Sequence, residues 1–159
     1  MQPISTHRTT LHELSLEQIQ AVLAGGAGGA PGTPEYPPAG SVTGLRIRVE
    51  KAGRGVPSGP WFQIVLRDTG QAIGDINLHD PPDRRGAVVV GIVLVESVHG
   101  QGLGTEVLAA TCAWALSQPG TRAVCAEIHT ENAASQRMAE KAGMRRTGRR
   151  GDEYRYRMP

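Results

Sequence analysis

Residues 88–105, VVVGIVLVESVHGQGLGT, join a β-branched apolar run to a triplet of glycines at positions 100, 102 and 104. A short apolar run bounded by glycine predicts a buried strand. The pattern that follows predicts a helix over about 102–118. A glycine-rich turn before a helix places free backbone N–H groups and the positive end of the helix dipole beside a bound anion. The segment therefore predicts a phosphate-binding loop between a strand and a helix.

Two common nucleotide-binding loops fit this segment poorly. A P-loop has the pattern GxxxxGK[ST], and no Lys-Ser or Lys-Thr pair follows these glycines. A dinucleotide-binding loop has the pattern GxGxxG and an acidic residue about 20 positions later, at the end of a second strand. Here the pattern is GxGxG, and Glu127, near that offset, lies inside an apolar strand pattern.

A second motif follows one helix and one strand later. Residues 124–144, VCAEIHTENAASQRMAEKAGM, predict a strand, a turn and a helix that Asn132 caps and Gly143 ends. With the glycine loop, this segment resembles the GCN5-related N-acetyltransferase (GNAT) superfamily, and within it the ribosomal-protein-alanine-acetyltransferase-like subfamily. HGQGLGT is similar to the family's (R/Q)GxGxG or (R/Q)GxGxA loop, and the second segment to N-x-x-S-x-x-x-x-E-K-x-G-(F/M). The matching residues of the second motif are Asn132, Ser135, Glu140, Lys141, Gly143 and Met144.

The resemblance implies an α/β (α+β) fold, the GNAT fold, with a mixed, mostly antiparallel twisted sheet of about six to seven strands and helices on both faces. The 159 residues are expected to form a single N-acetyltransferase domain, 1–159. Alternation over 8–14 predicts a first strand, and 61–67 with 71–78 predict a hairpin. The Gly/Pro-rich residues 25–40 predict a flexible loop in place of the second helix that such enzymes usually have there.

The resemblance also implies acetyl-CoA as a co-substrate and no metal. Backbone N–H groups of residues 101–105 would hold the pyrophosphate, and the backbone of 92–94 would pair with the pantetheine arm like another strand. His99 stands where the family prefers Arg or Gln, and it either donates to a phosphate or is an exposed loop histidine. The expected cofactor-binding residues are Ile92, Val93, Leu94, His99, Gly100, Gln101, Gly102, Leu103, Gly104, Thr105, Asn132 and Ser135.

Two catalytic groups that many relatives carry are missing from this sequence. A V-E-I-G-Y pattern with a catalytic glutamate corresponds to residues 88–92, which contain no carboxylate. The general-acid tyrosine corresponds to Ala139. Ser135 is the nearest remaining hydroxyl, and it either bonds the coenzyme sulfur or serves only the start of its helix.

Candidates for a general base lie on and near the strand before the second motif. Glu127 and His129 alternate on one face of this strand, so either side chain can relay a proton through water. The structural alternatives are an ion pair for Glu127 and a turn contact for His129. Glu96 and His79 are further candidates at strand ends. Positioning alone supplies much of the rate in such reactions, so a dedicated base is not required.

The expected function is acetyl transfer from acetyl-CoA to a primary amine by direct attack, with a small-molecule amine or a protein N-terminus as the acceptor. The alternative is a catalytically weak or silent acyl-CoA-binding or sensing module, because the usual glutamate and tyrosine are missing. A third possibility is an RNA-associated protein, from the six arginines between 145 and 157. A net charge of +2 argues against a nucleic-acid partner, and alternation there predicts a solvated arginine face on a final strand.

Other features indicate the compartment. No apolar stretch approaches the length of a membrane span, and the N-terminus lacks the apolar core of a secretory signal. Cys112 and Cys125 lie among apolar neighbours without a metal-like cluster, which predicts two reduced, buried thiols. The chain is therefore expected in the cytoplasm, without a membrane partner, as a monomer or homodimer.

Overall fold

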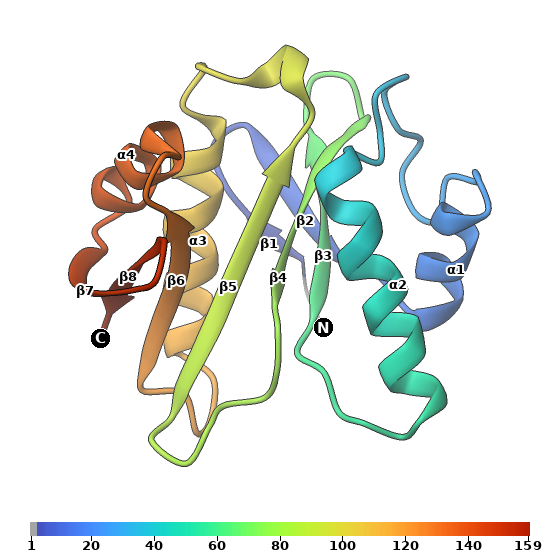
Figure 1. Cartoon of the computed structure of the whole chain (residues 1–159). Coiled ribbons are helices and arrows are strands. Elements are labelled where there is room, and N and C mark those ends of the chain that lie inside the picture. Colours follow the sequence, from blue (N-terminus) through green and yellow to red (C-terminus); the bar gives the residue numbers. More distant parts are fainter. Residues whose placement is uncertain (1–2) are drawn as a thin grey trace.

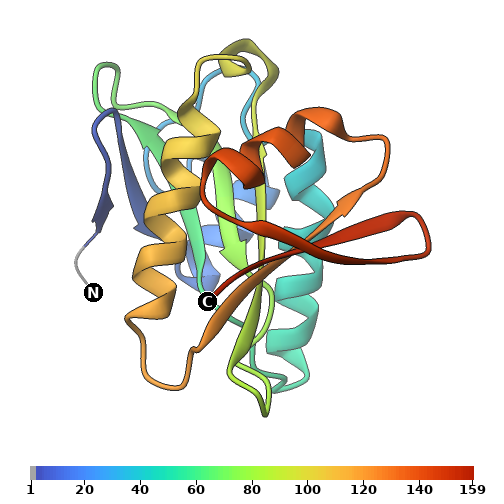
Figure 2. The ribbon, with the colours of Figure 1, turned by 90° about the vertical axis from the view of Figure 1, so that its left-hand side faces the viewer.

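The computed structural model describes residues 3–159 and consists of one open eight-stranded sheet with helices on both faces (Figures 1 and 2). The strands are β1 (Ile4–Ser5), β2 (Thr9–Glu13), β3 (Trp61–Leu66), β4 (Ala72–Leu78), β5 (Ala87–Leu94), β6 (Ala123–His129), β7 (Arg145–Arg150) and β8 (Glu153–Met158). The helices are α1 (Leu16–Leu23), α2 (Ala39–Gly53), α3 (Leu103–Leu116) and α4 (Ala133–Lys141), with a 3-10 turn, η1, at Glu96–Val98.

The strand order is β1-β2-β3-β4-β5-β6-β8-β7, and all neighbouring pairs are antiparallel except β5 and β6. The predicted mixed, mostly antiparallel sheet is confirmed. It has eight strands instead of six to seven, in part because the short β1 pairs with β2 ahead of the predicted first strand.

Apolar side chains form one core on each face of the sheet. Helices α3 and α4 cover the face of the larger core, and α1 and α2 cover the other (Figure 2). Alternation along each strand separates the two sets, so that Phe62 enters the larger core and its neighbour Trp61 enters the smaller one. The smaller core consists of Leu14, Ile19, Val22, Leu45 and Trp61.

The predicted elements of the N-terminal half are present. β2 lies within 8–14, and β3 and β4 form the predicted antiparallel hairpin. Ser15 and Gln18 form a capping box at the start of α1. The Ser15 N–H donates to Gln18 Oε1 at 2.9 Å, and the Gln18 N–H donates to Ser15 Oγ at 3.1 Å.

Helix α2 corrects the expectation that a loop over 25–40 replaces the second helix. The loop ends at Pro38, and the helix runs from Ala39 to Gly53. Its sequence has several glycines, no side-chain N-cap and only two buried residues, Ser41 and Leu45. Packing against the sheet and α1 therefore specifies this helix more than its local pattern does.

The parallel pair β5–β6 separates partway along its length. Ala87–Val89 pair with Ala123–Cys125, and no later β5 residue pairs with β6 within residues 3–159 (Figure 1). The Val89 carbonyl accepts from the His79 N–H on the β4 side, and the Val95 N–H donates to Ile73 on the same side. Backbone direction alternates along a strand, so the polar groups of Ile92 and Leu94 face the opening toward β6.

The C-terminal strands and the cysteines agree with the predictions. In β8 the side chains of Tyr154 and Tyr156 contact the larger core, while Arg155 and Arg157 are exposed. Cys112 and Cys125 are buried free thiols, and burial raises the pKa of Cys112 to about 11. Among the described residues, none of the helices has the length and apolar character needed to span a bilayer.

Candidate active site

The glycine loop connects β5 and η1 to α3. Gly100 and Gly102 have φ of +78° and +79°, a region that side chains disfavour. Gly102 is the N-cap of α3 and provides no side-chain cap, so the first-turn amides of the helix keep their donors free. At Gly104 a Cβ would collide with Met138 of α4, so glycine allows α3 and α4 to approach closely.

A cavity of about 600 Å³, here called the loop cavity, lies between this loop, the end of β5 and α4. Its walls are Ile92, Val93, Leu94, Val98, His99, Gly100, Gly102, Leu103, Gly104, Thr105, Asn132, Ala134, Ser135, Arg137, Met138 and Lys141. The structure thus brings together every predicted cofactor-binding residue except Gln101. Its backbone carbonyl instead accepts from Arg8 Nη1 at 2.9 Å.

The loop cavity has cationic walls. Its ionisable lining residues are His99, Arg137 and Lys141, and no carboxylate lines it. Sequence reasoning missed Arg137 and Lys141 as site residues. Their spacing of four on the helix that Asn132 caps, which places both on one face, is the signal that could have found them. Free amides and cations on one cavity wall favour an anionic ligand.

His99 closes the loop back onto β5. Its Nε2 donates to the Leu94 carbonyl at 2.9 Å. In the neutral ring that bond leaves Nδ1 as an acceptor, so only the protonated ring also donates to a phosphate. The Leu94 carbonyl is thereby occupied, and the free β5 edge consists of the Leu94 N–H and the two polar groups of Ile92.

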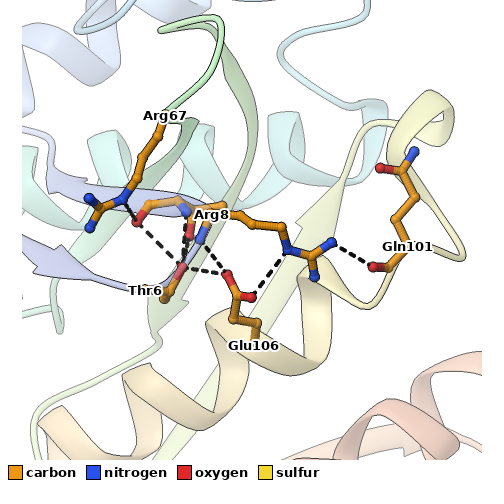
Figure 3. A network of polar contacts seen from close by, with 6 residues as sticks. Thr6, Arg8, Arg67, Gln101 and Glu106 are labelled. Carbon is orange, nitrogen blue, oxygen red and sulfur yellow. Dashed lines mark hydrogen bonds and ion pairs between the residues drawn. The ribbon is translucent and has the colours of Figure 1, made fainter.

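A polar network holds the loop from its other side (Figure 3). Glu106, in the first turn of α3, accepts from Thr6 Oγ1 at 2.6 Å and from the Arg8 N–H at 3.0 Å. Arg8 Nε pairs with Glu106 Oε1 at 3.2 Å, and Arg8 Nη1 reaches the Gln101 carbonyl. Partial burial raises the pKa of Glu106, but the bonds from Thr6 and Arg8 outweigh it and hold the pKa below its usual value.

A second cavity of about 510 Å³, here called the helix cavity, lies between α2, β4 and β5. Its walls are Gly40, Ser41, Gly44, Ile47, Arg48, Lys51, Ser58, Trp61, Asp75, Asn77, His79, Asp80, Val90, Gly91, Ile92, Val93, Glu127 and Glu153. Ile92 and Val93 line both cavities. The two cavities therefore meet at the part of β5 that has no partner on β6.

The helix cavity has an excess of acidic groups, unlike the loop cavity. Four acidic residues line it, Asp75, Asp80, Glu127 and Glu153. The lining has two cationic residues, Arg48 and Lys51. Lys51 Nζ pairs with Asp80 at 2.6 Å. Arg48 lies over the Trp61 ring, 5.6 Å from its centroid, and donates to the Leu78 carbonyl at 3.3 Å. Such a cavity favours a cationic ligand.

Asp75 is the buried carboxylate of the helix cavity, and sequence reasoning did not single it out. It is 2% exposed, and the Tyr36 hydroxyl donates to its Oδ1 at 2.7 Å. Burial raises the pKa of Asp75 to about 6, against hydrogen bonding that lowers it. Burial and the nearby charge of Asp75 also raise the pKa of Tyr36. This contact joins the 25–38 loop to β4.

Two of the predicted base candidates line the helix cavity. Glu127 lies on β6 with an exposed side chain, and His79 lies just after β4. A Cβ on Gly91 would be 2.9 Å from His79 Nε2, so the ring lies against the β5 backbone. Desolvation lowers the pKa of His79, and this outweighs the charges of Asp80 and Glu127, which raise it. A lowered pKa favours the neutral ring, which can accept a proton.

The other catalytic candidates are dispersed. Ser135 lines the loop cavity, and its N–H donates to Asn132 Oδ1 at 3.1 Å. His129 lines neither cavity: its Nε2 is 3.3 Å from Asp152, and its Nδ1 accepts from the Glu131 N–H at 3.1 Å. The structure thus places His129 in the turn contact that the sequence offered as its alternative. Glu96 is exposed on η1 and lines neither cavity.

Solved structures with the same fold are acetyltransferases. They include a GNAT-family acetyltransferase from Bacillus anthracis (20% identity, 98% of this chain and 97% of that chain, TM-score 0.68). An acetyltransferase from Agrobacterium tumefaciens has 20% identity, 100% and 95% coverage and a TM-score of 0.69. The ribosomal L7/L12 alpha-N-protein acetyltransferase RimL, in complex with coenzyme A, has 15% identity, 99% and 97% coverage and a TM-score of 0.71.

The family model of the acetyltransferase (GNAT) domain matches residues 8–145, and the chain belongs to this acetyltransferase family. No curated protein matches it in sequence. Within residues 3–159, no group of three or more His, Cys, Asp or Glu side chains is placed to hold a metal ion.

Proposed function

We propose that this protein is an acetyl-CoA-dependent N-acetyltransferase that acetylates a primary amine by direct attack. The observation that carries the proposal is the meeting of a cationic cavity and an acidic cavity at Ile92–Val93. An anionic coenzyme and a cationic amine would enter from these two sides, and their reacting ends would meet at β5.

The loop cavity fits the coenzyme. The glycine loop and the free amides at the start of α3 would hold the pyrophosphate, and Arg137 and Lys141 would add positive charge. The free backbone groups of Ile92 and Leu94 would pair with the pantetheine arm. Asn132 and Ser135 lie on the opposite wall. When bound, acetyl-CoA supplies a thioester carbonyl open to attack by an amine.

The helix cavity would orient the amine and receive its proton. Attack forms the amide bond as the C–S bond breaks, and the proton lost by the nitrogen must reach a base or the departing thiolate. His79 and Glu127 both line this cavity, so either would receive the proton. Ser135, which lines the loop cavity, would donate toward the sulfur.

Thiol release from acetyl-CoA tests this proposal. We expect release that depends on an added primary amine, screened with small amines and with peptides that have a free N-terminus. Gly104→Val, which would insert a side chain against Met138, should abolish the release. Glu127→Gln and His79→Gln should each leave measurable turnover, since positioning supplies much of the rate.

The missing glutamate and tyrosine favour a second candidate, a silent acyl-CoA-binding module. The tyrosine position holds Ala139, which is fully buried in the larger core and has no group to donate. Binding of acetyl-CoA without thiol release for any amine would establish this second function. Thiol release that requires an amine excludes it.

A further inference from the structure

Three buried polar atoms that lack a well-formed hydrogen bond line the wall of the helix cavity. Asp75 Oδ2, Trp61 Nε1 and Ser41 Oγ are all buried, and none makes a hydrogen bond of good geometry among the described residues, although Ser41 and Trp61 lie near enough to Asp75 to lower its pKa. The residues come from three elements, β4, β3 and α2. Buried polar groups without partners cost stability, so such a cluster in a cavity wall marks a site kept for function.

The negative charge of Asp75 has no cation beside it. The structure records no ion pair to its carboxylate within residues 3–159, and the donors that face it, Tyr36, Ser41 and Trp61, are all neutral. The two basic residues of the cavity have other contacts, Lys51 with Asp80 and Arg48 with Trp61. A buried charge that no neighbour neutralises acts strongly on an approaching ion, because little solvent screens it.

Asp75 is next to the point where the cavities meet. It lies directly opposite Val93 in the β4–β5 ladder, and Val93 lines both cavities. Opposite residues of an antiparallel pair have their side chains on the same face. The charge is therefore beside the place where the amine would attack.

The rest of the wall is apolar and shaped by small residues. A Cβ on Gly44 would lie 2.9 Å from the Trp61 ring, and one on Gly40 would lie 3.2 Å from Val93. These glycines, one turn apart on α2, bring the helix close to the sheet. Ile47 and Trp61 add apolar surface. The cavity thus combines an apolar wall with one buried anion.

We propose that Asp75 is the positioning residue that selects the acceptor, and that the acceptor is a primary amine on an apolar stem without a neighbouring carboxylate. The inference deepens the proposed function and rests on it. An ammonium gains from the buried anion, whereas the carboxylate of a free amino acid is repelled by it and by Glu127 and Glu153. An amine with a neighbouring amide, as at a peptide N-terminus, carries no such penalty.

Calorimetric titration of the CoA-saturated protein tests this with two matched probes, L-phenylalaninamide and L-phenylalanine. We expect the wild type to bind the amide at least about tenfold more tightly than the acid. Asp75→Asn should reduce this ratio to about threefold or less, whereas Asp75→Glu, which keeps the charge, should retain it. Asp68→Asn, in the exposed β3–β4 turn, should not change it.

Preference for the acid, binding of neither probe, or an unchanged ratio in Asp75→Asn would each overturn the inference. A preference for the acid would instead indicate that Arg48 binds the carboxylate. Acetyl-CoA turnover is measured separately on the same protein. Selective binding of the amide without thiol release would leave the role of Asp75 standing and contradict the proposed function.

Discussion

Arg8 Nη1 donates to the carbonyl of Gln101 at 2.9 Å, which ties the N-terminal strand pair to the glycine loop across more than ninety positions of sequence (Figure 3). The same guanidinium pairs with Glu106 in the first turn of α3. One side chain thus holds both the loop and the helix that follows it. Because Gly100 and Gly102 allow many conformations, this external contact restricts the loop to the shape in which we propose that it binds the coenzyme's phosphates.

Arg8→Ala should weaken CoA binding without unfolding the protein. The side chain is 41% exposed, so water screens its charge, and we expect an increase in Kd of about threefold to tenfold. Arg67→Ala is the matched control, because Arg67 donates to Thr9 in the same network but does not contact the loop. An equal effect of both substitutions on the calorimetric Kd would show that Arg8 acts only through general stability.

Gly104→Ala should cost the protein little stability, because the atoms that its Cβ meets, Met138 Cε and Sδ, are the end of a flexible side chain that can turn aside. Alanine also favours a helix over glycine, so we expect Tm to change by less than about 3 °C. Gly53→Ala is the control, since a Cβ there has nothing within 4 Å and alanine favours a helix. Thermal melting of the two variants should give similar values of Tm, and a large drop for Gly104→Ala alone would show that Met138 cannot move aside.

Arg137→Ala and Lys141→Ala should each weaken binding of CoA by about fivefold, and less at high salt, because we propose that both residues supply charge to its phosphates. Neither should change binding of pantetheine, which has no phosphate. Arg145→Ala, an exposed arginine on β7 outside the cavity, should leave both affinities unchanged. Equal losses for CoA and pantetheine would indicate that the two side chains support the cavity wall and do not contact phosphates.

Asp75→Asn should be more stable than the wild type at pH 8. Burial raises the pKa of Asp75 from 3.8 to about 6, so the native state disfavours the charged carboxylate. The wild type therefore loses stability as the pH rises from 3.8 through 6, whereas Asp75→Asn, which has no charge to bury, does not. Two units correspond to about 3 kcal/mol, and the difference between the proteins should disappear toward pH 4. The ionisable neighbours, unchanged in the variant, are Tyr36, Arg48, Lys51, His79, Asp80, Glu127 and Glu153.

Urea unfolding of both proteins from pH 4 to pH 8 gives this difference directly. If Asp75 serves only to stabilise the fold through its hydrogen bond from Tyr36, the difference in unfolding free energy would have the opposite sign. In that case Asp75→Asn would be the less stable protein at pH 8, and Tyr36→Phe would lose a similar amount.

The sequence predicted the half of the site that depends on local order. The glycine loop, the start of α3 and the Asn132-capped α4 lie in two short segments whose backbone chemistry follows from glycine and capping residues. Local order predicted a phosphate-binding loop before a helix, and the resemblance to the family then predicted most of the residues that line the loop cavity. The sequence did not identify Arg137 and Lys141 as site residues, because a charged helix face usually faces solvent. Only the position of α4 in the fold turns this face toward the glycine loop.

The helix cavity was not predictable, because its residues come together only through tertiary packing. Asp75 lies in an alternating strand pattern that gives no sign of burial, and its unpartnered oxygen depends on how α2 and Trp61 cover it. The sequence analysis also did not predict helix α2, because Gly40, Gly44 and Gly53 weaken the helical pattern of this segment. Gly40 and Gly44 also allow the helix to approach the sheet, so two of the residues that weaken the helical signal shape the cavity.

Thermal melting with acetyl-CoA, free CoA and ATP, each at saturating concentration, tests the central claim most directly. A ligand at 100 times its Kd stabilises the native state by about 2.7 kcal/mol, which raises Tm by several degrees. We expect such a shift with both coenzyme forms and none with ATP. No shift with either coenzyme would contradict the assignment of the loop cavity and, with it, the proposed acetyl transfer.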